Sequence, residues 1–136
     1  MISRIAIFLM ISFAVISVSN AAPAPEASQV EVSEFVQVPP ISVAMYNKRK
    51  RLAGTMTVIM QLKIGDADKR DMATKIMPRL RSAYTQETTK LALNFFDISR
   101  PVNANILGRS LQNVTNQVLK HGDARVLIGD IAVQKR

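Results

Sequence analysis

From Leu52 to Ile64, every second residue except Gly54 is a large apolar one, and most of the residues between them are polar. A period of two places the apolar side chains on one face of a long β-strand, and that face must be buried. The apolar set is Leu52, Met56, Val58, Met60, Leu62 and Ile64. Gly54 has the same phase and is predicted to mark a β-bulge. A chain built around such a strand must cover one face of a sheet with other elements.

A second alternating run, from Val38 to Tyr46, precedes this strand. Its apolar members on one side are Ile41, Val43 and Met45. Pro39 and Pro40 cannot donate backbone hydrogen bonds, so this strand either begins beside them or lies at an edge of the sheet. Polar residues 47–50 supply a turn between the two runs. The pattern predicts a β-hairpin with a basic tip.

After Gly65 the apolar period becomes that of a helix. Asp66 or Asp68 is predicted to cap its start, because a carboxylate accepts hydrogen bonds from the free amides of the first turn. Pro78 predicts a kink or short break near Met77, since proline removes a backbone hydrogen bond and clashes with the preceding turn. The apolar stripe of this helix is Met72, Ile76, Leu80, Tyr84 and Leu91.

A second helix is predicted to open at Asn103 or Asn105 and to end at Gly122. Its apolar stripe is Leu107, Leu111, Val114 and Val118. The β-branched run from Arg125 to Val133 predicts a last strand. The order strand, strand, helix, helix, strand indicates an α+β domain, with two helices on one side of a small antiparallel or mixed sheet.

The N-terminus has the parts of a secretory leader in their usual order. Arg4 precedes an apolar run from Ile5 to Val18, and the small residues Ser19 and Ala21 predict cleavage after Ala21. The alternative for residues 1–21 is a short membrane anchor, although spanning a bilayer takes roughly 20 apolar residues. Residues 22–34 are rich in Ala, Pro, Glu and Ser and predict a flexible tether. Residues 35–136 are then enough for one domain.

The residue types available for chemistry are few. The chain contains no cysteine, which excludes disulfides, thiolate metal sites and cysteine nucleophiles, and an exported domain without disulfides fits a bacterial periplasm. His121 is the only histidine, and its place near a helix end favours a structural role over metal ligation. Asp66, Asp68 and Asp71 lack the glycine and glutamate that complete a calcium loop, so helix capping is favoured. We expect no enzyme activity, no cofactor and no metal; an enzyme would need a pocket with convergent polar groups.

The positive charge, formally +8, is scattered except at the run Lys48, Arg49, Lys50 and Arg51. Aromatic residues make up only 5% of the chain, so an exported protein of this kind is not expected to bind nucleic acid. The basic run has two interpretations: it protects a sheet edge from pairing, or it contacts anionic headgroups or an acidic protein.

Phe95 and Phe96 are the second pair of candidate contact residues. Adjacent positions on a helix point in different directions, so both side chains cannot join one core stripe. One of the two is therefore a candidate to contact a partner.

Four segments occur in a specific order: the proline-flanked strand at 35–40, the helix at 77–84 with its Pro-Arg-Leu-Arg sequence, the helix at 111–119, and the closing strand at 125–134. Taken together, from Phe35 to Gln134, they resemble the periplasmic domain of the flagellar basal-body-associated FliL family. The resemblance implies a fold similar to stomatin/prohibitin-type domains. It also implies a non-catalytic accessory of the flagellar motor, whose members associate as rings around stator units and support torque under load.

From this resemblance we expect a binding and assembly protein on the periplasmic side of the bacterial inner membrane, supporting motility. Its partners would be flagellar stator or basal-body proteins and identical copies of itself. The alternative is a soluble periplasmic adaptor of the same fold that binds an acidic protein or an anionic membrane surface through Lys48 to Arg51.

Overall fold

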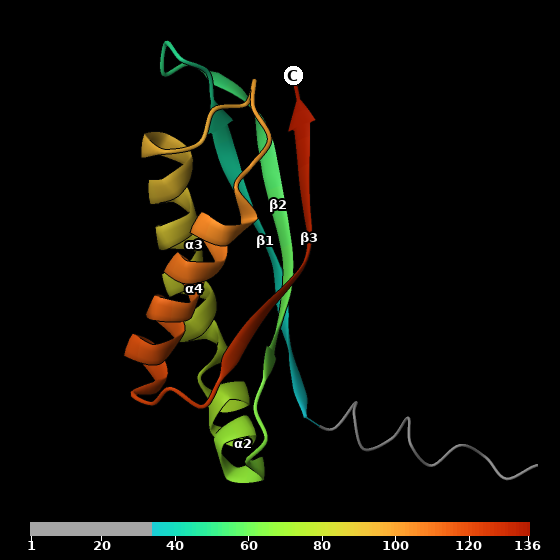
Figure 1. The fold of residues 1–136 in the computed structure, drawn as a ribbon, viewed down its shortest axis with the longest axis vertical. Helices are drawn as coiled ribbons and strands as arrows, with labels where there is room; N and C mark the ends of the chain where they lie inside the picture. Colours follow the sequence, from blue (N-terminus) through green and yellow to red (C-terminus); the bar gives the residue numbers. More distant parts are fainter. Residues whose placement is uncertain (1–33) are drawn as a thin grey trace, which may run out of the picture.

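The computed structural model describes residues 34–136 as a three-stranded antiparallel sheet with three helices (Figure 1). The strands are β1 (Phe35–Tyr46), β2 (Leu52–Lys63) and β3 (Arg125–Lys135), in the sheet order β1-β2-β3. The helices are α2 (Ala67–Lys75), α3 (Met77–Asn94) and α4 (Ala104–Leu119). The helices α3 and α4 cover one face of the sheet, which confirms the predicted α+β fold.

The predicted leader at 1–21 and the predicted tether up to residue 33 lie outside the described residues. From residue 34 onward, no helix has both the length and the apolar character that crossing a bilayer requires.

The core lies between the sheet and the two long helices, and most of it follows the predicted faces. The buried strand residues include Ile41, Val43, Met45, Met56, Val58, Met60 and Leu62. The buried helix residues include Leu80, Tyr84, Leu91, Leu107 and Leu111. Removing apolar surface from water at about 25 cal/mol per Å² is the main stabilisation of such a layer.

Two residues predicted for the core are exposed instead. Leu52 is 52% exposed because the register shifts by one residue at Ala53: Met45 pairs with Gly54, but Tyr46 pairs with Leu52. One inserted residue turns the next side chain to the opposite face of the sheet. The predicted bulge therefore lies immediately beside Gly54.

Met72 is 54% exposed because the predicted break falls at Ile76, which separates α2 from α3. The break changes the angular phase of the two helices, so the stripe of α3 does not continue into α2. Ala73 takes the buried position of α2 instead.

The helix starts follow the predicted caps. The Asp66 carboxylate accepts a hydrogen bond from the Lys69 amide at 3.0 Å, and the Asn103 side chain accepts from the amides of Asn105 and Ile106. The predicted end of the second helix at Gly122 is wrong: α4 ends at Leu119, and Lys120 takes the left-handed conformation with φ 60°. A lysine there carries a conformational cost that glycine would avoid.

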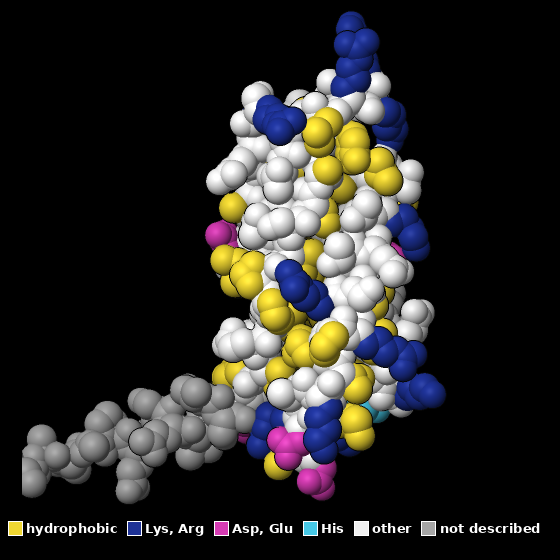
Figure 2. All heavy atoms as spheres, turned by 180° about the vertical axis from the view of Figure 1, so that it is seen from behind, with side chains coloured by type: hydrophobic (Ala, Val, Ile, Leu, Met, Phe, Trp, Pro, Cys, Tyr) yellow, Lys and Arg dark blue, Asp and Glu magenta, His cyan; other side chains and the backbone are white. Residues whose placement is uncertain are grey.

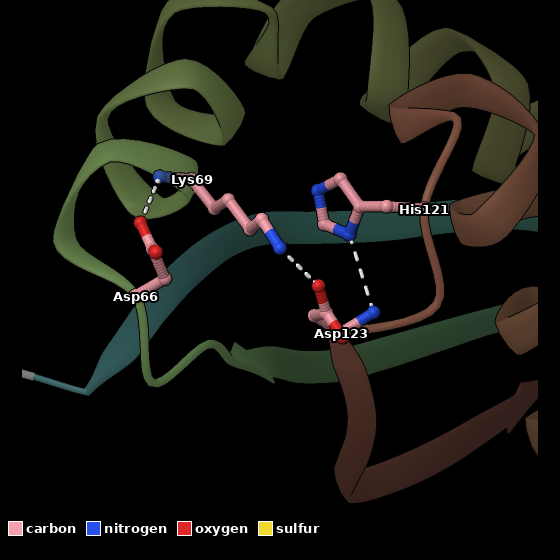
Figure 3. A network of polar contacts seen from close by, with 4 residues as sticks. All are labelled: Asp66, Lys69, His121 and Asp123. Carbon is pink, nitrogen blue, oxygen red and sulfur yellow. Dashed lines mark hydrogen bonds and ion pairs between the residues drawn. The ribbon is translucent and has the colours of Figure 1, made fainter.

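A polar network joins the start of α2 to the turn between α4 and β3 (Figure 3). The Lys69 ammonium donates to the Asp123 carboxylate, and the Asp123 amide donates to Nδ1 of His121 at 3.2 Å. The hydrogen bond between Lys69 and Asp123 raises the pKa of Lys69 and lowers the pKa of Asp123. These contacts connect Asp66, Lys69, His121 and Asp123 at this end of the domain.

β1 is an edge strand, which is one of the two places predicted for a strand containing Pro39 and Pro40. Its register with β2 shifts between Val38 and Ile41, so the two prolines form a bulge opposite Ile59. A bulge tolerates prolines because the ladder is already interrupted there.

Two threonines are fully buried on the helices, and their hydroxyl groups differ in bonding. Thr115 Oγ1 lies 2.7 Å from both the Tyr84 hydroxyl and the Leu111 carbonyl, whereas Thr88 Oγ1 has no hydrogen-bond partner within residues 34–136. An unpaired buried hydroxyl costs free energy that a methyl group does not.

We therefore expect Thr88→Val to raise the free energy of unfolding by about 1 kcal/mol, since it replaces the hydroxyl with a methyl group of similar volume. Thr115→Val is the matched control. This substitution should lower the free energy of unfolding by about 1–3 kcal/mol, because it leaves the Tyr84 hydroxyl unpaired. Urea unfolding of the two variants measures both changes. A destabilised Thr88→Val protein would contradict this assignment.

Candidate functional site

The hairpin tip, residues 47–51, is a folded turn. The Asn47 side-chain oxygen accepts hydrogen bonds from the amides of Arg49 and Arg51 at 2.9 and 3.1 Å. The Lys50 amide donates to the Asn47 carbonyl at 2.9 Å, and Lys50 has the left-handed φ of 59°. A turn followed by one left-handed residue is a common hairpin connection. The sequence therefore holds the four basic residues on a defined backbone.

Lys50 also ties the tip to the end of α3. Its ammonium group donates to the Leu93 carbonyl in the last turn of that helix. The last carbonyls of a helix have no partner inside the helix and carry partial negative charge, so a lysine stabilises them. This contact places the basic tip beside the residues that follow α3.

The connection between α3 and α4 is fixed to the same place. The Ile98 amide donates to the carbonyl of Tyr46, the last residue of β1, at 3.3 Å. The Asp97 carboxylate accepts from the Ser99 amide at 2.9 Å, which closes the turn. Two elements far apart in the sequence thus share one end of the domain, where the hairpin and the α3–α4 connection lie together in Figure 1.

Two open hollows lie where these elements meet. One, of about 410 Å³, lies between the hairpin tip and the α3–α4 connection, and its lining includes Lys48, Arg49 and Ser99. The other, of about 290 Å³, is lined by Lys48, Phe95, Phe96, Asp97, Arg100, Pro101, Asn103 and Ile106. Lys48 therefore borders both hollows.

The charge at this end is strongly positive. We use the name basic apex for its seven cationic residues, Lys48, Arg49, Lys50, Arg51, Arg100, Lys135 and Arg136. Figure 2 shows Lys and Arg side chains at the hairpin end, whereas most visible Asp and Glu side chains lie at the opposite end, mixed with Lys and Arg. Such a distribution attracts an acidic partner and orients its approach.

Asp97 is the acidic residue that borders both hollows. The backbone and side-chain hydrogen bonds from Ser99 lower the pKa of Asp97, and the charges of Lys48 and Arg100 lower it further. Its carboxylate stays ionised near neutral pH and is already bonded within its own turn.

As predicted, only one of the two phenylalanines joins the core, but their predicted place on a helix is wrong, because α3 ends at Asn94. Phe95 is the C-terminal cap of α3 and is 70% exposed, whereas Phe96 packs against the core. Ile106, at 41% exposed, adds a second apolar side chain to the same hollow as Phe95. An exposed aromatic residue beside cationic groups suits noncovalent binding of a partly apolar, acidic surface.

All six residues predicted as contacts, Lys48, Arg49, Lys50, Arg51, Phe95 and Phe96, thus lie at one end of the domain. Four further residues of this surface were not predicted from the sequence: Arg100, Ile106, Lys135 and Arg136. A sequence signal exists for Lys135 and Arg136, because β3 runs antiparallel to β2 and must end beside the start of β2. No sequence signal exists for Arg100 and Ile106, since their position depends on the packing of Ile98 against the hairpin.

No protein-family model matches this chain, and no curated protein matches it in sequence.

Proposed function

We propose that this protein is a non-catalytic binding and assembly protein that attaches to an acidic protein surface through its basic apex. The observation that carries the proposal is the meeting of the hairpin tip and the exposed Phe95 at one end of the domain. Cationic residues speed and orient the encounter, and the aromatic side chain supplies apolar contact area.

The rigidity of the apex supports this function. Asn47 holds the hairpin turn, and Lys50 and Ile98 connect it to the end of α3 and to the α3–α4 connection. A surface that is already ordered loses less conformational entropy on binding than a free loop does. Side chains on this frame can therefore bind without first ordering the backbone.

The setting we propose is the bacterial flagellar motor on the periplasmic side of the inner membrane, with stator or basal-body proteins and further copies of this chain as partners. What supports it is the resemblance to the FliL family together with the order of elements, two strands, helices and a closing strand, that the fold contains. In this setting the domain would transmit mechanical load through contacts and would carry out no chemistry of its own.

Deleting the gene is expected to reduce swimming and swarming while flagellar filaments still assemble. A strain carrying Lys48→Glu, Arg49→Glu and Arg51→Glu together should spread in soft agar as poorly as the deletion strain, because the apex would repel an acidic partner. Lys50 is left unchanged, since it supports α3. The measurement is the swarm diameter, with filaments counted by electron microscopy.

The matched control replaces three exposed arginines on the helices, Arg79, Arg81 and Arg109, with glutamate. This changes the net charge by the same amount away from the apex and should preserve motility. Normal motility in the deletion strain would contradict the motor setting. Loss of motility in the control alone would contradict the role of the apex.

The exposure of Phe95 among cationic residues also fits a second candidate, an anionic membrane surface, because aromatic side chains insert at the headgroup level. Vesicles with and without phosphatidylglycerol separate the two candidates. Cosedimentation with the anionic vesicles that is lost in the apex variant would favour the membrane over a protein partner.

A further inference from the structure

The sequence before the domain has the opposite charge to the basic apex. From Ile5 to Asn47 the chain contains no lysine or arginine, and its charged residues there are Glu26, Glu31 and Glu34. The predicted tether, residues 22–34, is therefore an acidic segment of the same chain. Val30 and Val32 flank Glu31, so an extended backbone would present two valines on one side and the carboxylate on the other.

The tether joins the domain at the end opposite the basic apex. Its last residue, Glu34, forms an ion pair with Lys63 at 3.5 Å, and β1 then runs through 12 residues to the hairpin (Figure 1). At roughly 3.3 Å per residue, β1 separates the tether from the apex by about 40 Å.

This distance limits which residues of the tether can reach the apex of their own domain. Fully extended, Glu31 reaches about 10 Å and Glu26 about 28 Å from Glu34. Glu31 and the two valines beside it therefore cannot contact the apex of their own domain. A second copy can supply the segment, since its tether approaches from outside.

We infer that the basic apex binds the acidic tether of a second copy of this chain, with residues 26–32 as the bound segment. Glu26 and Glu31 would pair with cationic residues of the apex, and Val30 and Val32 would pack on Phe95 and Ile106. The inference rests on the proposed function and names the acidic partner of that same surface. Because the two contacting surfaces differ, the association is head to tail, so each bound copy still offers a free apex or a free tether.

The test uses a fluorescent peptide of residues 22–33 and the purified protein. Fluorescence anisotropy should show binding that weakens about tenfold between 50 and 300 mM salt. Peptide binding should also weaken about tenfold in a triple variant, since three exposed charge pairs are lost. The variant carries Lys48→Gln, Arg49→Gln and Arg51→Gln. Arg79→Gln, Arg81→Gln and Arg109→Gln together form the matched control and should bind like the unmodified protein.

A peptide with Glu26→Gln and Glu31→Gln should bind at least tenfold more weakly, and the same two substitutions in the full chain should reduce self-association in sedimentation velocity. Phe95→Ala, at an exposed position, tests the apolar contact without a change of charge and should weaken peptide binding. Circular dichroism verifies that each variant is folded.

Absence of peptide binding, or binding that the apex variant retains, would overturn the inference. The proposed function would still stand if the apex glutamate variant impaired motility. If that variant neither impaired motility nor changed peptide binding, both proposals would fail.

Discussion

Gly54→Ala is expected to lower the free energy of unfolding by about 3 kcal/mol or more. A Cβ atom at this position would lie 2.1 Å from the backbone oxygen of Gln134 and 2.5 Å from Cδ1 of Ile98. The first neighbour belongs to the paired strand β3 and cannot rotate away. The substitution would therefore separate β2 from β3 or break their pairing at this point.

Gly108→Ala is the matched control for this prediction. Gly108 lies inside α4, and a Cβ atom there would meet only Cδ1 of Ile128 at 3.6 Å, an ordinary contact distance. Alanine in a helix interior is favoured over glycine by about 0.5–1 kcal/mol, so this variant should be slightly more stable than the unmodified protein. Chemical denaturation of both variants gives the comparison. Equal stabilities would show that β3 does not lie as close to β2 as described.

Alkaline pH is expected to destabilise the protein through Tyr84. Burial raises the pKa of Tyr84 to about 12. Since Thr115 donates its own proton to the Leu111 carbonyl, the Tyr84 hydroxyl is the donor in their bond. Ionisation would remove that donor and leave a buried charge.

The folded-state pKa lies above the ordinary value of 10, so the folded protein holds this proton more tightly than the unfolded chain does. The stabilisation is complete below pH 10 and is lost as the pH rises toward 12. The loss from this group is about 1.4 kcal/mol at pH 11 and about 2–3 kcal/mol above pH 12.

Tyr84→Phe isolates this effect. At pH 8 the variant should be less stable by about 1 kcal/mol, because it lacks the hydrogen bond. Between pH 10 and 12 it should become the more stable of the two proteins, since it has no proton to lose. Urea unfolding curves from pH 8 to pH 11.5 measure the difference. A difference that stays constant over this range would contradict the assignment.

Sequence patterns predicted the fold class, the hairpin and the break before α3, and they gave Asp66 and Asn103 as one of two candidate caps at each helix start. These features depend on local physics: alternation in strands, the missing amide hydrogen of proline, and side-chain acceptors at helix starts. The exceptions, Leu52 and Met72, follow a bulge and a helix break. Both interruptions were predicted. The direction in which the neighbouring side chains point, however, depends on the exact residue at which each interruption occurs.

The candidate site was predicted only as separate pieces. The basic run and the phenylalanine pair were each visible in the sequence, but nothing local indicated that they meet. Their meeting depends on the contacts of Lys50 with Leu93 and of Ile98 with Tyr46, which join positions more than forty residues apart. A single sequence contains no signal for such pairs.

The two edge strands of the sheet, β1 and β3, differ in their capacity to pair with a further strand, because β1 contains Pro39 and Pro40. Both prolines lack an amide hydrogen and lie in a β-bulge, and each of these features disfavours pairing along an edge strand. A foreign strand cannot form an uninterrupted ladder along β1. Fibril growth by adding strands of other molecules is therefore disfavoured on that flank, and any protection against it on the other flank must come from β3 itself.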